Sequence, residues 1–238
     1  MAGRFRSKRY KESLKNVPAR PVTVEQAVPI LKKFQLAKFD ETVNLVVHLG
    51  IDAKQADQMV RGSLSLPKGI GKTRRVIAFV QGSNIEAARA AGAIEAGDDD
   101  LIKKINDGWL DFDVAIATPD MMPKITKLGK ILGPQGKMPS PKAGTVTTEV
   151  AGAVKEYAAG KVEFRNDAGG NIHAAVGKVS FSEKDLADNI HAFLNTIRRL
   201  KPPTAKGKFI KRVTLHSTMS PGLEIDTAHL DVEAVEAA

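Results

Sequence analysis

The sequence predicts an α/β and α+β protein, in which an α+β domain built from both ends of the chain is interrupted by an inserted α/β domain. Residues 22–67 and 161–227 alternate apolar and polar side chains in the period of a half-buried strand, and they also hold amphipathic helical segments. Residues 68–160 instead contain short continuous apolar runs between helical segments, which is typical of parallel strands buried on both faces. A chain of 238 residues is long enough for two such domains. We expect the connections near 67–71 and near Gly160 to act as a double hinge.

The N-terminal part of the chain predicts an arm, one helix and two strands. Residues 1–21 carry seven basic residues and one acidic residue without helical or strand periodicity, which indicates a mobile basic arm. A capping-box pattern at 23–26 begins a helix, in which Pro29 should remove a hydrogen bond and bend the axis. Alternating apolar residues predict strands at 43–49 and 64–66.

The middle of the chain predicts a parallel sheet with helices between its strands. The apolar runs 76–80 and 114–117 are expected to be the buried strands. Helices are expected at 85–91 and after the three aspartates 98–100, whose charge favours a helix N-terminus. A third helix is expected at 150–159, where a glycine follows and ends it.

The C-terminal part returns to the alternating pattern. Strands are expected at 162–166 and 172–179, joined by a turn of the sequence Asp-Ala-Gly-Gly. Ser182 caps an amphipathic helix that a pair of prolines ends. Two more strands, 209–216 and 223–226, are expected on either side of a turn.

The charge of the chain indicates a polyanionic partner, because the net charge is +9. Three blocks, 1–21, 121–145 and 197–213, hold seven, five and seven basic residues with one acidic residue among them. An acidic stretch at 95–120 and an acidic tail at 228–238 offset these blocks. A solvated face is the alternative explanation for any single block.

Composition and spacing exclude several classes of protein. No cysteine is present, which excludes disulfides, thiolate metal sites and cysteine nucleophiles and indicates a reducing, cytoplasmic environment. No apolar run reaches about 18 residues, so we expect no membrane partner. The five histidines lack the spacing of metal ligands. The chain has no G-x-S-x-G motif of a serine nucleophile, and no pair of carboxylates stands out as a general acid and base. We therefore expect no metal, no cofactor and no catalysis.

One segment resembles part of a nucleotide-binding loop but lacks two features that define such loops. Residues 69–73 match the end of a phosphate-binding P-loop, which would need glycine where Leu66 stands and a helix, rather than a strand, after Lys72. An enzyme that holds a nucleotide in the inserted domain is therefore the second hypothesis, behind an RNA-binding structural protein.

The loop 127–145 is a candidate phosphate-binding segment. It combines four glycines, three prolines and four lysines with no acidic residue, so it should form neither a helix nor a central strand. Glycine would let the backbone approach a ligand, and the lysines would meet phosphates. A surface loop that is merely soluble is the alternative.

Three segments at strand ends, 38–42, 165–167 and 217–220, could converge on the split domain. Their lysine and arginine side chains would bind phosphates, their hydroxyls would bind ribose 2′-OH groups, and Phe39 and Met219 would contact ribose or base. A core position is the alternative for Phe39. Aromatic residues make up only 5% of the chain, which argues against a base-stacking platform for single strands.

Several motifs together resemble one family of ribosomal proteins. They are KFDETV at 38–43, QMVRGSLSLPKGIGK at 58–72, DGWLDFDVAIATPDMM at 107–122, LGKILGPQGKMPSPKAGTVT at 128–147, KVEFRND at 161–167, NIHAAVGKVSF at 171–181 and STM at 217–219. Over about residues 20–227 the chain is similar to the bacterial protein of the mobile lateral stalk of the large subunit, the ribosomal protein L-one family. The resemblance implies a split first domain and an inserted Rossmann-like, three-layer α/β domain.

The resemblance also implies a function and site residues. It implies binding of stalk-region rRNA, help in releasing deacylated tRNA from the exit site, and repression of the protein's own operon mRNA. The principal RNA surface would comprise Lys38, Phe39, Thr42, Arg165, His173, Thr218, Met219 and Ser220. An auxiliary rRNA contact on the inserted domain would comprise Lys130, Lys137 and Lys142.

One position departs from the family pattern. Ser220 stands where the family has glycine, so a less close approach of the backbone to RNA is expected there. We expect a protein of the cytoplasmic ribosome that is a monomer when free. A repressor that acts off the ribosome is a third hypothesis, and it differs only in its RNA partner.

Overall fold

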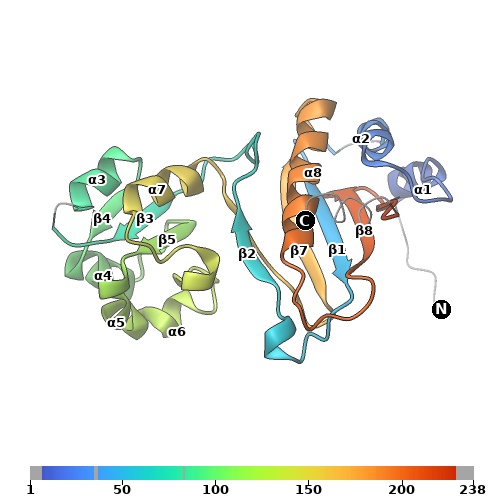
Figure 1. Ribbon diagram of the computed structural model, residues 1–238. Coiled ribbons are helices and arrows are strands. Elements are labelled where there is room, and N and C mark those ends of the chain that lie inside the picture. Colours follow the sequence, from blue (N-terminus) through green and yellow to red (C-terminus); the bar gives the residue numbers. More distant parts are fainter. Residues whose placement is uncertain (1–6, 35–36, 83, 229–238) are drawn as a thin grey trace. The chain divides into compact units, whose positions relative to one another are not determined.

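The computed structural model describes residues 7–34, 37–82 and 84–228. Contacts divide the chain into two compact units, which are labelled by element in Figure 1. Unit 1 comprises Met1–Val60, Leu66–Ile70 and Phe164–Ala238, and unit 2 comprises Arg61–Ser65 and Gly71–Glu163. The expected domain limits and the double hinge stay predictions. Residues 1–6 of the expected arm and the acidic tail from residue 229 onward lie outside the described residues.

Unit 1 contains a four-stranded antiparallel sheet in the order β7-β1-β8-β9. The strands are β1 (Thr42–Leu49), β7 (Asn171–Lys178), β8 (Ile210–Ser217) and β9 (Leu223–Ile225). Every second residue of β1 is buried, as its alternating sequence predicts. Helix α8 (Glu183–Arg199) packs against β7, and α2 (Val24–Lys33) packs against β8, β9 and α8, so both helices cover one face of the sheet.

The ends of these two helices follow the sequence signals. The Ser182 hydroxyl caps α8 by accepting a hydrogen bond from the backbone N–H of Asp185 at 3.1 Å. The Gln26 side chain accepts one from the backbone N–H of Thr23 at 3.4 Å, which completes the capping box of α2. Pro29 lies inside α2, as expected.

The N-terminal arm is not free of regular structure. Lys8–Lys15 form helix α1, although the sequence predicted no helix before residue 22, so that prediction was wrong. The Ser7 hydroxyl caps the helix by accepting from the backbone N–H of Tyr10 at 3.2 Å, and Ser13 is buried. A local cap and one small buried side chain stabilise α1 without the apolar repeat on which the prediction depended.

The segment Leu66–Ile70 is fastened to unit 1 by one buried side chain. Asn189 of α8 is fully buried, and its amide donates to the carbonyl of Gly69 at 3.0 Å and to that of Val176 at 2.8 Å. Its oxygen accepts from the backbone N–H of Lys68 at 3.1 Å. A buried amide with all these partners satisfied holds the segment in place.

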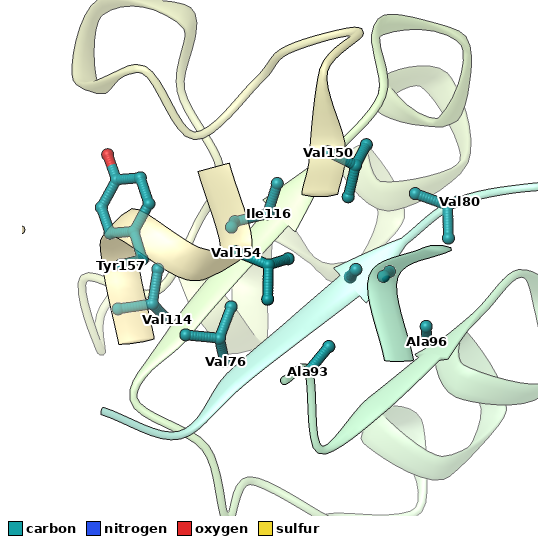
Figure 2. Packing of buried hydrophobic residues seen from close by; sticks show 11 residues of the cluster. Val76, Val80, Ala93, Ala96, Val114, Ile116, Val150, Val154 and Tyr157 are labelled. Atoms are coloured by element: carbon teal, nitrogen blue, oxygen red, sulfur yellow. The ribbon is translucent and has the colours of Figure 1, made fainter. Parts of the chain in front are cut away.

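Unit 2 contains a three-stranded parallel sheet in the order β4-β3-β5. The strands are β3 (Val76–Phe79), β4 (Glu95–Gly97) and β5 (Val114–Ala117), and all residues of β3 and β5 are buried, as their continuous apolar runs predict. On one face, Val76 and Ala78 pack with helices α3 (Asn84–Ala90) and α7 (Val150–Ala158). Figure 2 shows Val76 in this cluster together with Val150 and Val154 of α7. On the other, Ile77 and Phe79 pack with α4 (Asp99–Asn106), α5 (Met122–Ile125) and α6 (Gly129–Leu132). The sheet therefore lies between two helical layers.

The remaining elements are short. A two-stranded sheet pairs β2 (Arg61–Leu64) with β6 (Val162–Arg165), and 3-10 helices lie at Ala56–Gln58, Pro119–Met121, Thr126–Leu128 and Pro141–Ala143. The loop 127–145 was wrongly predicted to hold no helix, because Gly129–Leu132 is helical and buries Leu128 and Leu132 in the core. β4 was also missed, since its three residues are too few for a recognisable pattern. Among the residues described, no helix has the length and apolar character needed to cross a bilayer.

Candidate nucleic-acid interface

The antiparallel sheet of unit 1 carries helices on one face, and we call the other its open face. The open face comprises Thr42, Asn44, Val46 and His48 of β1, Asn171, His173, Ala175 and Lys178 of β7, Arg212, Thr214 and His216 of β8, and Glu224 of β9. These residues pair across the strands, with Val46 between His173 and Thr214 and with His48 between Asn171 and Arg212. Side chains of directly paired residues point to the same side of a sheet, so these residues form one continuous surface, which is polar except at Val46 and Ala175.

A buried carboxylate joins two of the predicted segments at one end of this face. Glu41 is 1% exposed, and its Oε1 accepts from the backbone N–H of Ala37 at 2.6 Å. Its Oε2 accepts from the Ser217 hydroxyl at 2.5 Å and from the backbone N–H of Met219 at 3.0 Å. The segment 38–42 and the turn 217–220 are therefore held together by one side chain.

The same contacts set the charge of this carboxylate. Burial alone would raise the pKa of Glu41, but the hydrogen bonds from Ser217, Ala37 and Met219 outweigh it and hold the pKa below its usual range. The charge of Arg9 in α1 adds to this lowering.

Hydrogen bonds of Thr218 and Ser220 also hold the turn 217–220 in place beside Thr42. The Thr218 hydroxyl accepts from the backbone N–H of Thr42 at 3.2 Å and lies 3.4 Å from its carbonyl. The Ser220 hydroxyl accepts from the backbone N–H of Ser217 at 2.9 Å and donates to the Pro221 carbonyl at 2.9 Å. Ser220 has no positive φ, so serine fits here without backbone strain.

Above this buried anchor, large side chains are exposed. Phe39 is 54% exposed and Met219 is 49% exposed, so Phe39 is not a core residue. Lys38 is exposed beside Phe39. Thr42 is half-buried, and Lys178 of β7 donates to its hydroxyl at 3.0 Å. The structure therefore brings six of the predicted residues together: Lys38, Phe39, Thr42, Thr218, Met219 and Ser220.

Arg165 and His173 lie farther along the sheet. His173 is exposed and pairs with Val46, four residues along β1 from Thr42, or about 13 Å. Its Nε2 lies 3.7 Å from Oδ2 of Asp167. Arg165 is exposed and precedes Asn166, whose backbone bridges to Ile172, so Arg165 and His173 are neighbours at the β7 edge.

The three auxiliary lysines of unit 2 differ from one another. Lys130 is exposed on α6. Lys137 is half-buried; its ammonium donates to the carbonyl of Leu110 at 3.0 Å and lies 5.0 Å from the centre of the Phe112 ring, so it has partners within unit 2. Lys142 belongs to the 3-10 helix Pro141–Ala143, and its side chain lies outside the described part of the structure.

Sequence reasoning missed Glu41 as the anchor of the surface. A signal was present, because Glu41 continues the buried phase of β1, in which Val43, Leu45 and Val47 follow at every second position. An ionisable side chain in that phase must have internal partners to be buried. Lys178 was missed as well, since its place at the end of β7 becomes informative only once β7 pairs with β1.

The segment 69–73 lacks the helix that a phosphate-binding P-loop requires. Residues 71–75 after the glycine pair are not helical, and strand β3 follows them, as the sequence predicted. No cluster of three or more potential metal-ligating side chains occurs among residues 7–34, 37–82 and 84–228. His229, one of the five histidines, lies outside these residues.

Comparison with known proteins identifies the family. The model of the "Ribosomal protein L1p/L10e family" matches residues 31–221. A protein of Protochlamydia amoebophila named large ribosomal subunit protein uL1 is 49% identical over 97% of this chain and 98% of its own length. Proteins of the same name from Cutibacterium acnes and Thermobifida fusca are each 51% identical over 93% of this chain and 96% and 94% of their own lengths. Because the family model matches most of the chain and these relatives are about 50% identical to it, this chain belongs to the ribosomal protein L1p/L10e family.

Proposed function

We propose that the protein binds the stalk region of large-subunit rRNA through the open face of unit 1 and the exposed residues at its Thr42 end. As a member of a family of ribosomal proteins, the chain is not an enzyme. Its relatives are named as proteins of the large ribosomal subunit, which assigns this chain to the ribosome of the cytoplasm. The specific RNA contacts are our proposal.

The observation that carries the proposal is the contrast between the buried anchor and the surface above it. Glu41 is nearly inaccessible, whereas Phe39, two residues before it, and Met219, whose backbone N–H donates to it, have side chains that are about half exposed. An exposed apolar pair held by a buried hydrogen-bond network is a preorganised contact surface, which reduces the entropy lost on binding.

The chemistry of the surroundings suits a folded RNA. Lys38, Arg165 and Lys178 supply cations for phosphates, and hydroxyl and imidazole groups line the face between them. Phe39 and Met219 would pack on ribose or an unstacked base. The sheet would thus read the shape of the RNA and its 2′-hydroxyl groups.

The remaining functions rest on the family resemblance. The same surface would bind a leader of the protein's own operon mRNA that mimics the rRNA site, and this would repress translation. Unit 2 would make the auxiliary rRNA contact through Lys130 and Lys142, and the stalk as a whole would help release deacylated tRNA from the exit site. The free protein would be a monomer.

The test compares two exposed methionines. Met219→Ala should weaken binding to a stalk rRNA fragment about tenfold, because it removes apolar contact worth about 1.5 kcal/mol. Met59→Ala is the matched control, since Met59 is 41% exposed in unit 1 and is not part of the open face. Filter binding at fixed salt gives both affinities, and the leader mRNA can replace the rRNA fragment.

Equal affinities for the two variants would refute the proposed surface. Copurification of the wild-type chain with large ribosomal subunits would test its cellular partner separately.

A further inference from the structure

A β-bulge gives the open face two adjacent cations at the end far from Met219. His48 pairs with Arg212, but the next residue, Leu49, pairs with Ile210, so Lys211 is the extra residue of β8. In a regular strand, Lys211 and Arg212 would point to opposite faces. The bulge leaves both side chains exposed. From Val213 onward, buried residues of β8 alternate with half-buried ones, as in a regular strand.

These two cations stand beside a hollow in the sheet surface. The hollow has a volume of about 550 Å³ and is lined by Val46, His48, Asn171, Lys211, Arg212 and Thr214. That volume lies within the range of about 300–1,000 Å³ typical of small-ligand sites. The lining combines an apolar side chain with a hydroxyl, an imidazole and two positive charges.

A chain of hydrogen bonds fixes the orientation of the imidazole in this hollow. The Asp167 carboxylate accepts from the backbone and side-chain N–H groups of Asn171, which lower the pKa of Asp167 and keep it ionised. The Asn171 amide nitrogen therefore faces Asp167, and its oxygen faces His48, 2.8 Å from Nδ1. Since an amide oxygen only accepts, Nδ1 of His48 is the donor in this contact, and Nε2 is the ring nitrogen that can accept a hydrogen bond from a ligand.

We propose that this hollow binds one ribonucleotide of the RNA, with Lys211 and Arg212 on its phosphate and with Nε2 of His48 accepting from its ribose 2′-OH. The inference rests on the proposed RNA-binding function and extends it to residues outside the Thr42 end. Arg212 is braced by Glu224 of β9, whose Oε1 lies 3.0 Å from its Nε, so the guanidinium is already positioned. A 2′-OH acceptor in this place would make the site prefer ribose to deoxyribose.

The experiment combines protein variants with single 2′-deoxy substitutions in a stalk rRNA fragment. For the wild-type chain, one position should weaken binding about fivefold when its 2′-OH is removed. His48→Ala should weaken binding to the unmodified fragment by a similar factor, and the deoxy substitution at that position should then have no further effect.

Lys211→Ala gives a second readout that does not depend on His48. It should lower the slope of log affinity against log salt by about 0.7 to 0.9, the contribution of one phosphate contact. Lys184→Ala is the matched control, because Lys184 is an exposed lysine in the first turn of α8, on the covered face of the sheet. Its slope should equal that of the wild-type chain.

The outcomes separate this inference from the function on which it rests. If the wild-type chain does not bind the fragment, both fall. If it binds and His48→Ala keeps the full deoxy penalty, or Lys211→Ala keeps the wild-type slope, only the nucleotide site falls. Binding of free adenosine monophosphate in the hollow, without any deoxy effect in the RNA, would overturn RNA as the source of the nucleotide.

Discussion

The two sheets of the molecule differ in how many faces they leave to solvent. The antiparallel sheet of unit 1 is covered by α2 and α8 on one face, whereas the parallel sheet of unit 2 is covered by helices on both. β1 consequently alternates buried and half-buried residues, while β3 and β5 are buried throughout. Unit 1 can therefore use the middle of its sheet as a binding surface, and unit 2 can use only its edges and loops.

Individual cations of the two units also differ in the partners that they have within the protein. Lys38 and Lys211 of unit 1 are exposed beside a sheet face. In unit 2, Lys124 forms ion pairs with Asp98 at 2.9 Å and Asp99 at 3.1 Å. Lys137 donates a hydrogen bond to the carbonyl of Leu110 and lies over the Phe112 ring. Such residues are partly committed to their own unit, as Arg212 of unit 1 is by its ion pair with Glu224, so counting basic residues along the sequence overstates the charge available to RNA.

The largest expected effect is on the buried anchor of unit 1. Glu41→Ala leaves two backbone N–H groups and the Ser217 hydroxyl without their partner, which should lower the free energy of unfolding by about 4 kcal/mol. RNA binding should also be lost, because the segment 38–42 and the turn 217–220 are no longer held together. Hydrogen exchange of the amides of β1 would measure the loss of stability.

Unit 2 provides the internal control for this variant. Trp109 is the only tryptophan of the chain and lies in unit 2, so its fluorescence follows that unit alone. We expect its unfolding transition to stay unchanged in Glu41→Ala. An equal shift of both signals would show that the units unfold together and would break the comparison.

The sequence predicted the elements of both sheets better than the surface that they form. Period-two alternation located β1, β7 and β8, and continuous apolar runs located β3 and β5, because burial on one face or on two leaves a direct trace in the sequence. Helix α1 and strand β4 were missed, since short elements have no repeat to detect. Side-chain chemistry at a strand end and the family resemblance, rather than periodicity, selected Thr218 and Met219.

The parts of the surface that could not be predicted depend on pairing between distant strands. The cations Lys211 and Arg212 share one face only because of a bulge opposite His48, and a bulge is a property of two strands together. The tautomer of His48 depends in the same way on Asn171, which is 123 residues away in the chain. Such features follow from register, which a single strand does not encode.

A smaller effect distinguishes two lysines of unit 2. Lys137→Ala should lower the stability of unit 2 by about 1 kcal/mol, because it removes a charged hydrogen bond to Leu110 and the contact with the Phe112 ring. Lys130→Ala should leave stability unchanged, since Lys130 is exposed, and should weaken RNA binding instead. Trp109 fluorescence during urea unfolding measures the first effect, and filter binding measures the second. A stable Lys137→Ala protein with weakened RNA binding would contradict this division of roles.

The smallest expected effect is the pH dependence that Glu41 gives to unit 1. Its pKa in the folded protein is below the ordinary value of 4.5, so it stabilises the folded state fully above that pH, and the stabilisation is lost as the pH falls through the folded pKa. Several other carboxyls have lowered pKa values, including Asp113 of unit 2, so the contribution of Glu41 must be isolated by comparing two proteins.

Ser217→Ala removes one hydrogen bond to the ionised Glu41, so the pKa of Glu41 in the variant should lie closer to 4.5. The difference in unfolding free energy between wild type and Ser217→Ala should therefore be greatest near neutral pH and shrink in acid. A difference that stays constant from about pH 7 to about pH 3 would show that the Ser217 hydroxyl acts without regard to the charge of Glu41.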